Sequence, residues 1–332
     1  MGIRAVALGS AVAAAMVVVA PVAAAQQAVP LRWVAMGDAF TAGGIDAAGQ
    51  ELLVGGRRDG CGRTSGAYPK LLADRLVGTY QVVDVSCAGA SIANVVLDAQ
   101  RPVGRHVPFF EVYDPDFPFP LVPRQIDAVT ANTAVVSVGV GGNTLGFVEL
   151  VQTCLQLGEW ADPDTDSPCA DFFTYGGDGV VTIAERLDAV ADQYGAMLDQ
   201  IRAAAPRATI LAVGYPTIFP TDPATCAYGY TAAGMRAFAV TSRPDIAWLR
   251  TQVVERLNLV ISQQALLHGA RYVDVYTPTA RHDVCRPDGL NWVEGMVDRQ
   301  GRWAVVRPNT AGHLATANAV QAALPTSRSA KA

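Results

Sequence analysis

The chain has 332 residues, of which 51% are hydrophobic and 17% are charged, and its formal net charge is −5. This composition provides enough apolar surface for a large core and excludes an intrinsically disordered chain. The acidic excess argues against nucleic acid or an anionic membrane face as the main partner. The length fits either one large α/β domain or two smaller domains.

The first 25 residues have the pattern of a secretory signal peptide. A short basic start that includes Arg4 precedes an almost wholly apolar run over residues 5–22, and the alanines at 23–25 supply an A-x-A cleavage site. An uncleaved membrane anchor is the alternative, because the apolar run is nearly long enough to span a bilayer. The presence of the cleavage site favours a signal peptide that is removed. We therefore expect a secreted protein with no stable membrane span once the signal peptide is removed.

Between residues 30 and 325, short apolar runs alternate with segments of helical periodicity, and residues 326–332 form a polar tail. The apolar runs predict five strands, at Arg32–Gly37, Gln81–Cys87, Thr133–Val140, Ala208–Tyr215 and Arg271–Tyr276. The helical periodicity predicts helices at Gly66–Leu76, Thr182–Ala204 and Asp245–His268. Asp245 follows Pro244 and is expected to cap the last of these helices. The alternation implies a single α/β domain with a parallel sheet covered on both faces, whose ligands bind outside the carboxyl ends of the strands.

Three longer stretches interrupt the alternation, at Val103–Pro123, Cys154–Gly179 and Pro216–Pro244. Each is long for a plain connection. We therefore expect each either to line a pocket or to form a small subdomain.

Six cysteines fit an exported protein: Cys61, Cys87, Cys154, Cys169, Cys226 and Cys285. An even number in an oxidising compartment predicts three disulfides, although sequence alone allows about 15 pairings. Zinc binding is the competing interpretation. The chain has no C-x-x-C pair and only four histidines, so we expect no metal site.

Four short blocks carry the residues that could serve catalysis. The first strand ends in a Gly-Asp turn in which Ala39 follows Asp38, and Gly89 follows the second strand. Asn143 lies in a Gly-Gly-Asn-Thr-Leu-Gly-Phe segment after the third strand, and Arg307 begins an Arg-Pro-Asn-Thr-Ala-Gly-His segment near the end. A lone Gly-Asp turn is weak evidence, and Gly89 alone fits an ordinary strand-to-helix turn. The occurrence of all four blocks in this order is a more specific signal than any single block.

In this order the blocks resemble those of secreted bacterial SGNH (GDSL-type) hydrolases, esterase/lipase branch, over about residues 31–323. The chain has no G-x-S-x-G motif, which argues against the competing assignment to the α/β-hydrolase family. The resemblance implies a three-layer α/β/α, flavodoxin-like fold with a central parallel sheet, a monomer, and no cofactor. It also implies the disulfide pairs Cys61–Cys87, Cys154–Cys169 and Cys226–Cys285.

The resemblance assigns a role to one residue of each block. Position 39 is the place of the nucleophilic serine, and the chain has Ala39 there; the place of the general base is taken by Arg307. Gly89, through its N–H, and Asn143, through its side-chain amide, match the oxyanion donors. Alanine offers no nucleophile and arginine does not deprotonate in proteins, so both groups that acyl transfer requires are missing.

Two further positions depart from the family pattern: Thr144 stands where aspartate is usual, and Ala304 stands where many members carry the aspartate that orients the base. His313 matches the second histidine of the last block, which belongs to a helix in the family. Either His313 or the pair His282–Asp283 could act as a displaced base, but structural roles are the simpler interpretation. The other histidines have no catalytic neighbours in the sequence and are expected to be structural or exposed: His106 and His268.

Two classes of function follow from these positions. The first is a secreted, catalytically inactive binding or partner protein, in which Gly89, Asn143 and Arg307 converge on a small acyl, ester or anionic ligand. If Arg307 instead turns outward, the site has simply decayed. The second is an active carboxylic ester hydrolase whose native nucleophile is serine at position 39, as in an engineered Ser→Ala variant. Because both the nucleophile and the base are missing, which are two independent losses, the first class is favoured.

Overall fold

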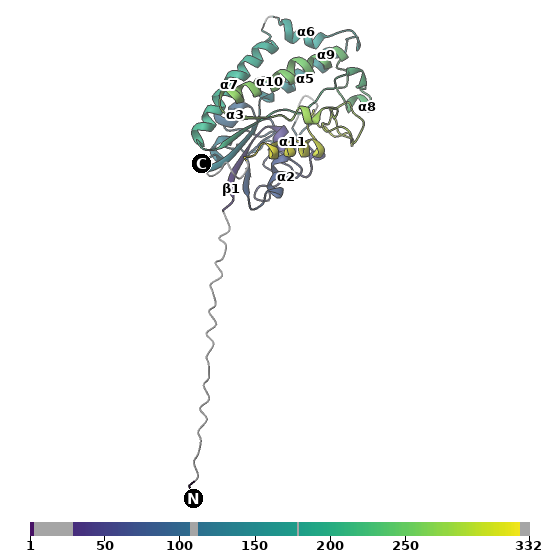
Figure 1. Cartoon of the computed structure of the whole chain (residues 1–332). Helices are drawn as coiled ribbons and strands as arrows, with labels where there is room; N and C mark the ends of the chain where they lie inside the picture. The colour runs from purple at the N-terminus through teal and green to yellow at the C-terminus, as the bar shows by residue number, and fades with distance from the viewer. Residues whose placement is uncertain (3–28, 107–111, 178, 326–332) are drawn as a thin grey trace.

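The computed structural model describes residues 1–2, 29–106, 112–177 and 179–325 (Figure 1). Nearly all of the expected signal peptide, and the polar tail, lie outside these residues. Within them, five strands form one parallel sheet: β1 (Leu31–Gly37), β2 (Tyr80–Asp84), β3 (Thr133–Gly139), β4 (Thr209–Val213) and β5 (Arg271–Val273). Their order in the sheet is β2-β1-β3-β4-β5. The α/β class and the parallel sheet are confirmed.

The four strands after β1 all end before their predicted limits. The difference is largest for β2 and β5, and an aspartate explains each of these two cases. The carboxylate of Asp84 accepts a hydrogen bond from the N–H of Ser86 (3.0 Å), and that of Asp274 accepts one from Thr277 (3.0 Å). Aspartates that bond to nearby backbone N–H groups in this way favour turns over strands. The chain therefore leaves the sheet while its residues are still apolar.

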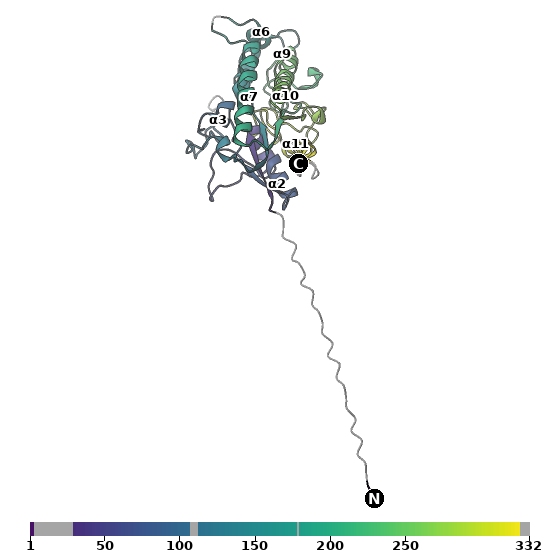
Figure 2. The same cartoon turned by 60° about the vertical axis from the view of Figure 1, so that its left-hand side comes forward.

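Helices cover both faces of the sheet (Figures 1 and 2). Side chains alternate along the strands, so Trp33 packs with α2 and α11 on one face while Val34 packs with α7 and α10 on the other. The longer helices are α2 (Tyr68–Arg75), α5 (Phe147–Gly158), α6 (Pro168–Tyr175), α7 (Ile183–Ala204), α10 (Glu255–Leu267) and α11 (Thr310–Ala322). The short helices are α1 (Ala39–Ala42), α3 (Ile92–Val96), α4 (Gly142–Leu145), α8 (Ala232–Met235) and α9 (Arg243–Trp248).

The helix expected at Asp245–His268 begins earlier, and a π-helical segment at Leu249–Val254 separates α9 from α10. The prediction that Asp245 caps it is wrong, because Ser242 is the N-cap. The Asp245 carboxylate instead accepts hydrogen bonds from the N–H groups of Cys169 (3.2 Å) and Ala170 (2.8 Å). Asp245 therefore caps the first turn of α6, a helix that lies far away in the sequence.

The three predicted disulfides are all confirmed: Cys61–Cys87, Cys154–Cys169 and Cys226–Cys285. The second links α5 to α6, and the third links the segments that follow β4 and β5. Two of the three long stretches contain helices of their own, α6 and α8, which lie beyond the edge of the sheet in Figure 1. Among the helices in the described part of the chain, none has the length and hydropathy to cross a bilayer.

Candidate functional site

The site lies where the strand order reverses, between β1 and β3 at the centre of the sheet. Because the chain leaves these strands in opposite directions, a crevice forms at their carboxyl ends. A cavity of ≈ 160 Å³ occupies this place. The four site positions expected from the sequence all line it: Ala39, Gly89, Asn143 and Arg307. The structure thus brings together residues from four separate segments of the chain.

Asp38 joins β1 to α1, and its buried carboxylate organises the floor of the cavity. It accepts hydrogen bonds from the Phe40 N–H (2.8 Å) and the Tyr215 hydroxyl (2.6 Å). Burial raises the pKa of Asp38 to about 6, against the opposing effects of these two donors and of the Arg307 charge. The Tyr215 hydroxyl also accepts a bond from the Gly142 N–H (2.7 Å). One chain of bonds therefore connects the ends of β1, β3 and β4.

The two expected oxyanion donors lie close together, Gly89 on the loop after β2 and Asn143 in the first turn of α4. Gly89 has a φ of 80°, in the left-handed region that favours glycine, and its N–H has no hydrogen-bond partner among the described residues. The Asn143 side-chain amide donates to the carbonyl of Ala90 (2.9 Å), which ties it to the loop that carries Gly89. An amide nitrogen has two N–H bonds, so one remains for a ligand.

A β-bulge directs Arg307 towards the cavity. The antiparallel bridges Val293–Pro308 and Val297–Trp303 enclose three residues on one side (294–296) and four on the other (304–307). Val305 and Val306 both have positive φ values, 47° and 56°. Such angles are strained for β-branched residues, and bulges are common beside active sites because they re-aim a side chain.

Arg307 is half-buried and lines the cavity, so the outward orientation considered above is not adopted. Its Nη1 donates to the carbonyl of Gly44 (2.9 Å). A Cβ at Gly44 would lie 2.9 Å from this nitrogen, so the approach depends on glycine. Burial lowers the pKa of Arg307, while the negative charge of Asp38 raises it. The guanidinium therefore has a carbonyl and a nearby carboxylate as its local partners.

The two other departures from the family pattern have structural roles here. The Thr144 hydroxyl accepts a hydrogen bond from the N–H of Ile92 (2.9 Å), at the start of α3. Ala304 is buried in a small apolar cluster with Ile45 and Ala48. A carboxylate at position 304 would meet apolar neighbours.

Neither of the two displaced-base candidates lines the cavity. His313 is buried in α11, its Nδ1 accepts a bond from the Tyr68 N–H (3.4 Å), and burial lowers its pKa to about 4. His282 stacks on Trp292 with ring centroids 3.5 Å apart, and its Nδ1 lies 2.7 Å from the Leu290 carbonyl. Their contacts are structural.

The remaining wall of the cavity is mainly apolar, and its members include Phe40, Phe147, Val148, Ile218, Val254 and Leu257. Three features of this site could not be predicted from the sequence. His106 also lines the cavity and stacks on Phe117, with ring centroids 4.1 Å apart, but no motif marks it. The Asp38–Tyr215 bond and the bulge have no local signal in the sequence either, although Tyr215 ends a predicted strand.

Within the described ranges, no set of three or more His, Cys, Asp or Glu side chains is arranged to hold a metal ion.

Comparisons with a family model and with known proteins all indicate the same family. Residues 35–315 match the model of the GDSL-like lipase/acylhydrolase family. An esterase of Streptomyces scabiei is 30% identical over 296 residues, which cover 85% of this chain and 79% of that protein. Lipase 2 of Streptomyces coelicolor is 29% identical over 286 residues, with 83% and 80% covered.

Two solved structures share the fold. The phospholipase A1 from Streptomyces albidoflavus has a TM-score of 0.59 at 21% identity, and the extracellular lipase from Streptomyces rimosus has 0.60 at 19%. Each match covers 89% of this chain and 100% of the other. With the family match over nearly the whole described domain, the chain belongs to the GDSL-like lipase/acylhydrolase family.

Proposed function

We propose that this chain binds an acyl ligand in the cavity at the carboxyl ends of the strands and does not hydrolyse it. The observation that carries the proposal is Ala39, which places a methyl group where acyl transfer needs a hydroxyl. Among the described residues that line the cavity there is no serine, threonine or cysteine. Loss of the nucleophile in a serine hydrolase lowers turnover by about a millionfold. The remaining donors would retain roughly a thousandfold effect over water.

The missing base supports the same conclusion. Arg307 stays protonated in a protein and cannot accept a proton from a hydroxyl. His313 and His282 have structural contacts outside the cavity. His106 lines the cavity but has no serine, threonine or cysteine hydroxyl or thiol beside it to activate. A catalyst would therefore need two groups that this site lacks.

The same cavity is suited to hold a carboxyl group at one end of an apolar chain. The Gly89 N–H, the free N–H of Asn143 and the Arg307 guanidinium are the donors for carboxyl oxygens, and the apolar wall would contact the chain. Asp38 already offsets part of the Arg307 charge. We therefore expect weak, salt-sensitive binding of a free carboxylate.

Secretion and a monomeric state belong to the same proposal. Three disulfides fit an oxidising compartment, and the extracellular lipase from Streptomyces rimosus is one of the structures that share the fold. The second candidate function is ester hydrolysis by a natural form with serine at position 39. Family membership and the similarity to the Streptomyces scabiei esterase favour it.

Two measurements test the proposal. The purified protein should not hydrolyse short or long acyl esters above background, and laurate should bind by calorimetry with a stoichiometry of about one. Arg307→Ala should abolish laurate binding, because it removes the only cationic group of the cavity wall in the described structure. Arg75→Ala, which changes a surface arginine bound to Asn318, is the matched control and should bind laurate normally. Ester turnover that persists after contaminants are removed would favour the second candidate.

A further inference from the structure

A second cavity, of ≈ 270 Å³, adjoins the first. Val305 and Arg307 line both cavities, so the bulged segment forms their common wall. The chemistry of the second cavity differs from that of the first. Where the first is mainly apolar, the second carries four more charged side chains: Asp46, Arg105, Asp298 and Arg302.

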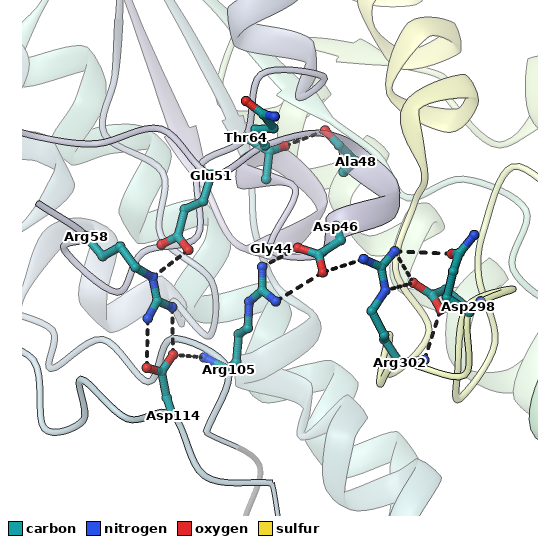
Figure 3. A network of polar contacts seen from close by, with 12 residues as sticks. Gly44, Asp46, Ala48, Glu51, Arg58, Thr64, Arg105, Asp114, Asp298 and Arg302 are labelled. Atoms are coloured by element: carbon teal, nitrogen blue, oxygen red, sulfur yellow. Dashed lines mark hydrogen bonds and ion pairs between the residues drawn. The ribbon is translucent and has the colours of Figure 1, made fainter. Parts of the chain in front are cut away.

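These four side chains are paired with one another in a continuous network (Figure 3). Asp46 binds Arg105 (Nη1–Oδ2 3.1 Å) and Arg302 (Nη1–Oδ2 2.7 Å). Arg302 in turn binds Asp298 through Nε (2.7 Å). The two positive and two negative charges balance within the network. An anion would have to compete with Asp46 for the guanidinium groups of Arg105 and Arg302. The third arginine of the lining, Arg307, is shared with the first cavity and donates to the Gly44 carbonyl. The second cavity is therefore poorly suited to a phosphate or a sulfate.

A neutral, hydroxyl-rich group suits the network better. A hydroxyl both donates and accepts, so it can bond to a carboxylate and to a guanidinium at the same time. The side chains of Arg105 and Arg302 are 50% and 46% exposed, which leaves N–H groups within reach of a ligand. Ile45 and Trp303 add an apolar wall on which the C–H face of a sugar ring can pack.

We propose that the second cavity binds the sugar or polyol headgroup of a ligand whose acyl chain occupies the first cavity. The ester link of such a ligand would lie beside Arg307, the residue that both cavities share. This inference rests on the proposed function, since it requires an acyl chain to be held without cleavage. It identifies the ligand as an acylated sugar or polyol rather than a free fatty acid.

Calorimetry with three probes, each below its critical micelle concentration, tests the headgroup. Laurate has a free carboxylate and no headgroup, sucrose monolaurate has a neutral sugar in an ester link, and dodecyl phosphate has an anion. Because the probes also differ at the carboxyl group, the headgroup contribution is measured as the loss of affinity that variants of the second cavity cause. We expect a loss of about tenfold for sucrose monolaurate, the effect of two or three hydrogen bonds. The affinity for dodecyl phosphate should not change in the same variants. A loss of dodecyl phosphate affinity in them would make the second cavity an anion site and overturn the inference.

Variants separate the two cavities. Arg302→Gln and, separately, Arg105→Gln should weaken the binding of sucrose monolaurate about tenfold and leave laurate binding unchanged, which also shows that each variant is folded. Arg124→Gln is the matched control. The side chain of Arg124 is 45% exposed, is paired with Asp127 and belongs to neither cavity lining, so the change should alter neither affinity. If laurate binds through Arg307 but neither variant weakens the binding of sucrose monolaurate, only this inference fails. If neither probe binds the unmodified protein, the proposed function fails as well.

Discussion

Arg307 stands where the family resemblance places a general base, and its surroundings accommodate a cation. Gly44 leaves room for the guanidinium and accepts a hydrogen bond from it, and Asp38 lies close enough to shift its pKa. A bulge with two strained valines aims the residue inward. Since strained backbone persists only where its surroundings enforce it, this geometry favours a retained binding role over simple decay of the site.

The first prediction concerns repair of catalysis. Ala39→Ser alone should give little esterase activity, because a serine without a base is a poor nucleophile. Ala39→Ser with Arg307→His should restore measurable turnover of short acyl esters, since Gly89 and Asn143 line the same cavity. Ala39→Ser with Arg307→Gln is the control, and it should stay inactive.

A fully active Ala39→Ser single variant would contradict this prediction. Another group would then supply the base, and His106 is the one imidazole among the described residues that line the cavity. The chain as written would in that case be a trapped form of an active hydrolase.

The second prediction concerns the pH dependence of stability through His313. Burial lowers the pKa of His313 from 6.5 to about 4 in the folded protein, so the unfolded chain binds its proton more tightly. The His313 contribution is therefore complete above pH 6.5 and is lost as the pH falls towards 4. Each pKa unit is worth about 1.4 kcal/mol, which gives a change of about 3 kcal/mol over this range.

His313→Asn is the variant that isolates this effect, because an asparagine oxygen can still accept the bond from the Tyr68 N–H. We expect the difference in unfolding free energy between the two proteins to grow by about 3 kcal/mol from pH 4 to pH 6.5. Urea unfolding at several pH values measures it. Parallel curves for the two proteins would show that His313 is not held neutral by burial.

Asp38 acts in the opposite direction, since its pKa is raised to about 6 and its stabilising effect is lost as the pH rises.

At the scale of elements, the disulfides join the loops that surround the site to the rest of the domain. Cys61–Cys87 connects the segment before α2 to the loop of Gly89, and Cys226–Cys285 connects the segments after β4 and β5. These segments have few regular backbone bonds of their own. The cross-links therefore limit the freedom of loops that the sheet alone does not hold.

The third prediction compares two cross-links. In the chain-entropy model, loss of Cys226–Cys285, with a sequence separation of 59, should cost about 4 kcal/mol of unfolding free energy. Loss of Cys154–Cys169, with a separation of 15, should cost about 3 kcal/mol. The double Cys→Ala variants, unfolded in urea, measure both values. A larger loss for the shorter loop would show that native contacts, rather than restriction of the unfolded chain, decide the effect.

At the scale of the whole molecule, two features are consistent with an extracellular protein. All six cysteines are paired in disulfides, and the whole chain has a net charge of −5. We expect residues 1–25 to direct export and then to be removed.

The fourth prediction concerns this processing. When the full chain is expressed in a bacterial secretion host, the protein in the medium should begin at Gln26 and have no reactive thiols. Intact mass and N-terminal sequencing measure both features, and size-exclusion chromatography should show a monomer. Recovery of the full-length chain in the membrane fraction would support an uncleaved anchor instead.

Much of the fold could be predicted from local patterns. The short apolar runs predicted all five strands, and a period of 3.6 residues predicted α7 from Thr182 to Ala204 with almost no error. These signals are local, because side-chain alternation and capping involve residues close in the chain. The site positions Ala39, Gly89, Asn143 and Arg307, and the disulfide pairing, came from the resemblance to a known family.

Only the tertiary structure decided the contacts between distant segments. Asp245 caps α6 rather than its own helix, and Tyr215 bonds to Asp38 across 177 positions of the chain. The bulge at Val305 and Val306 likewise depends on the partner segment that faces it. The second cavity exists because the loop of Asp46 meets the segment around Arg302, 256 positions later. No local pattern encodes such pairings, since many partners satisfy the same hydrogen bond and only the packed chain selects one.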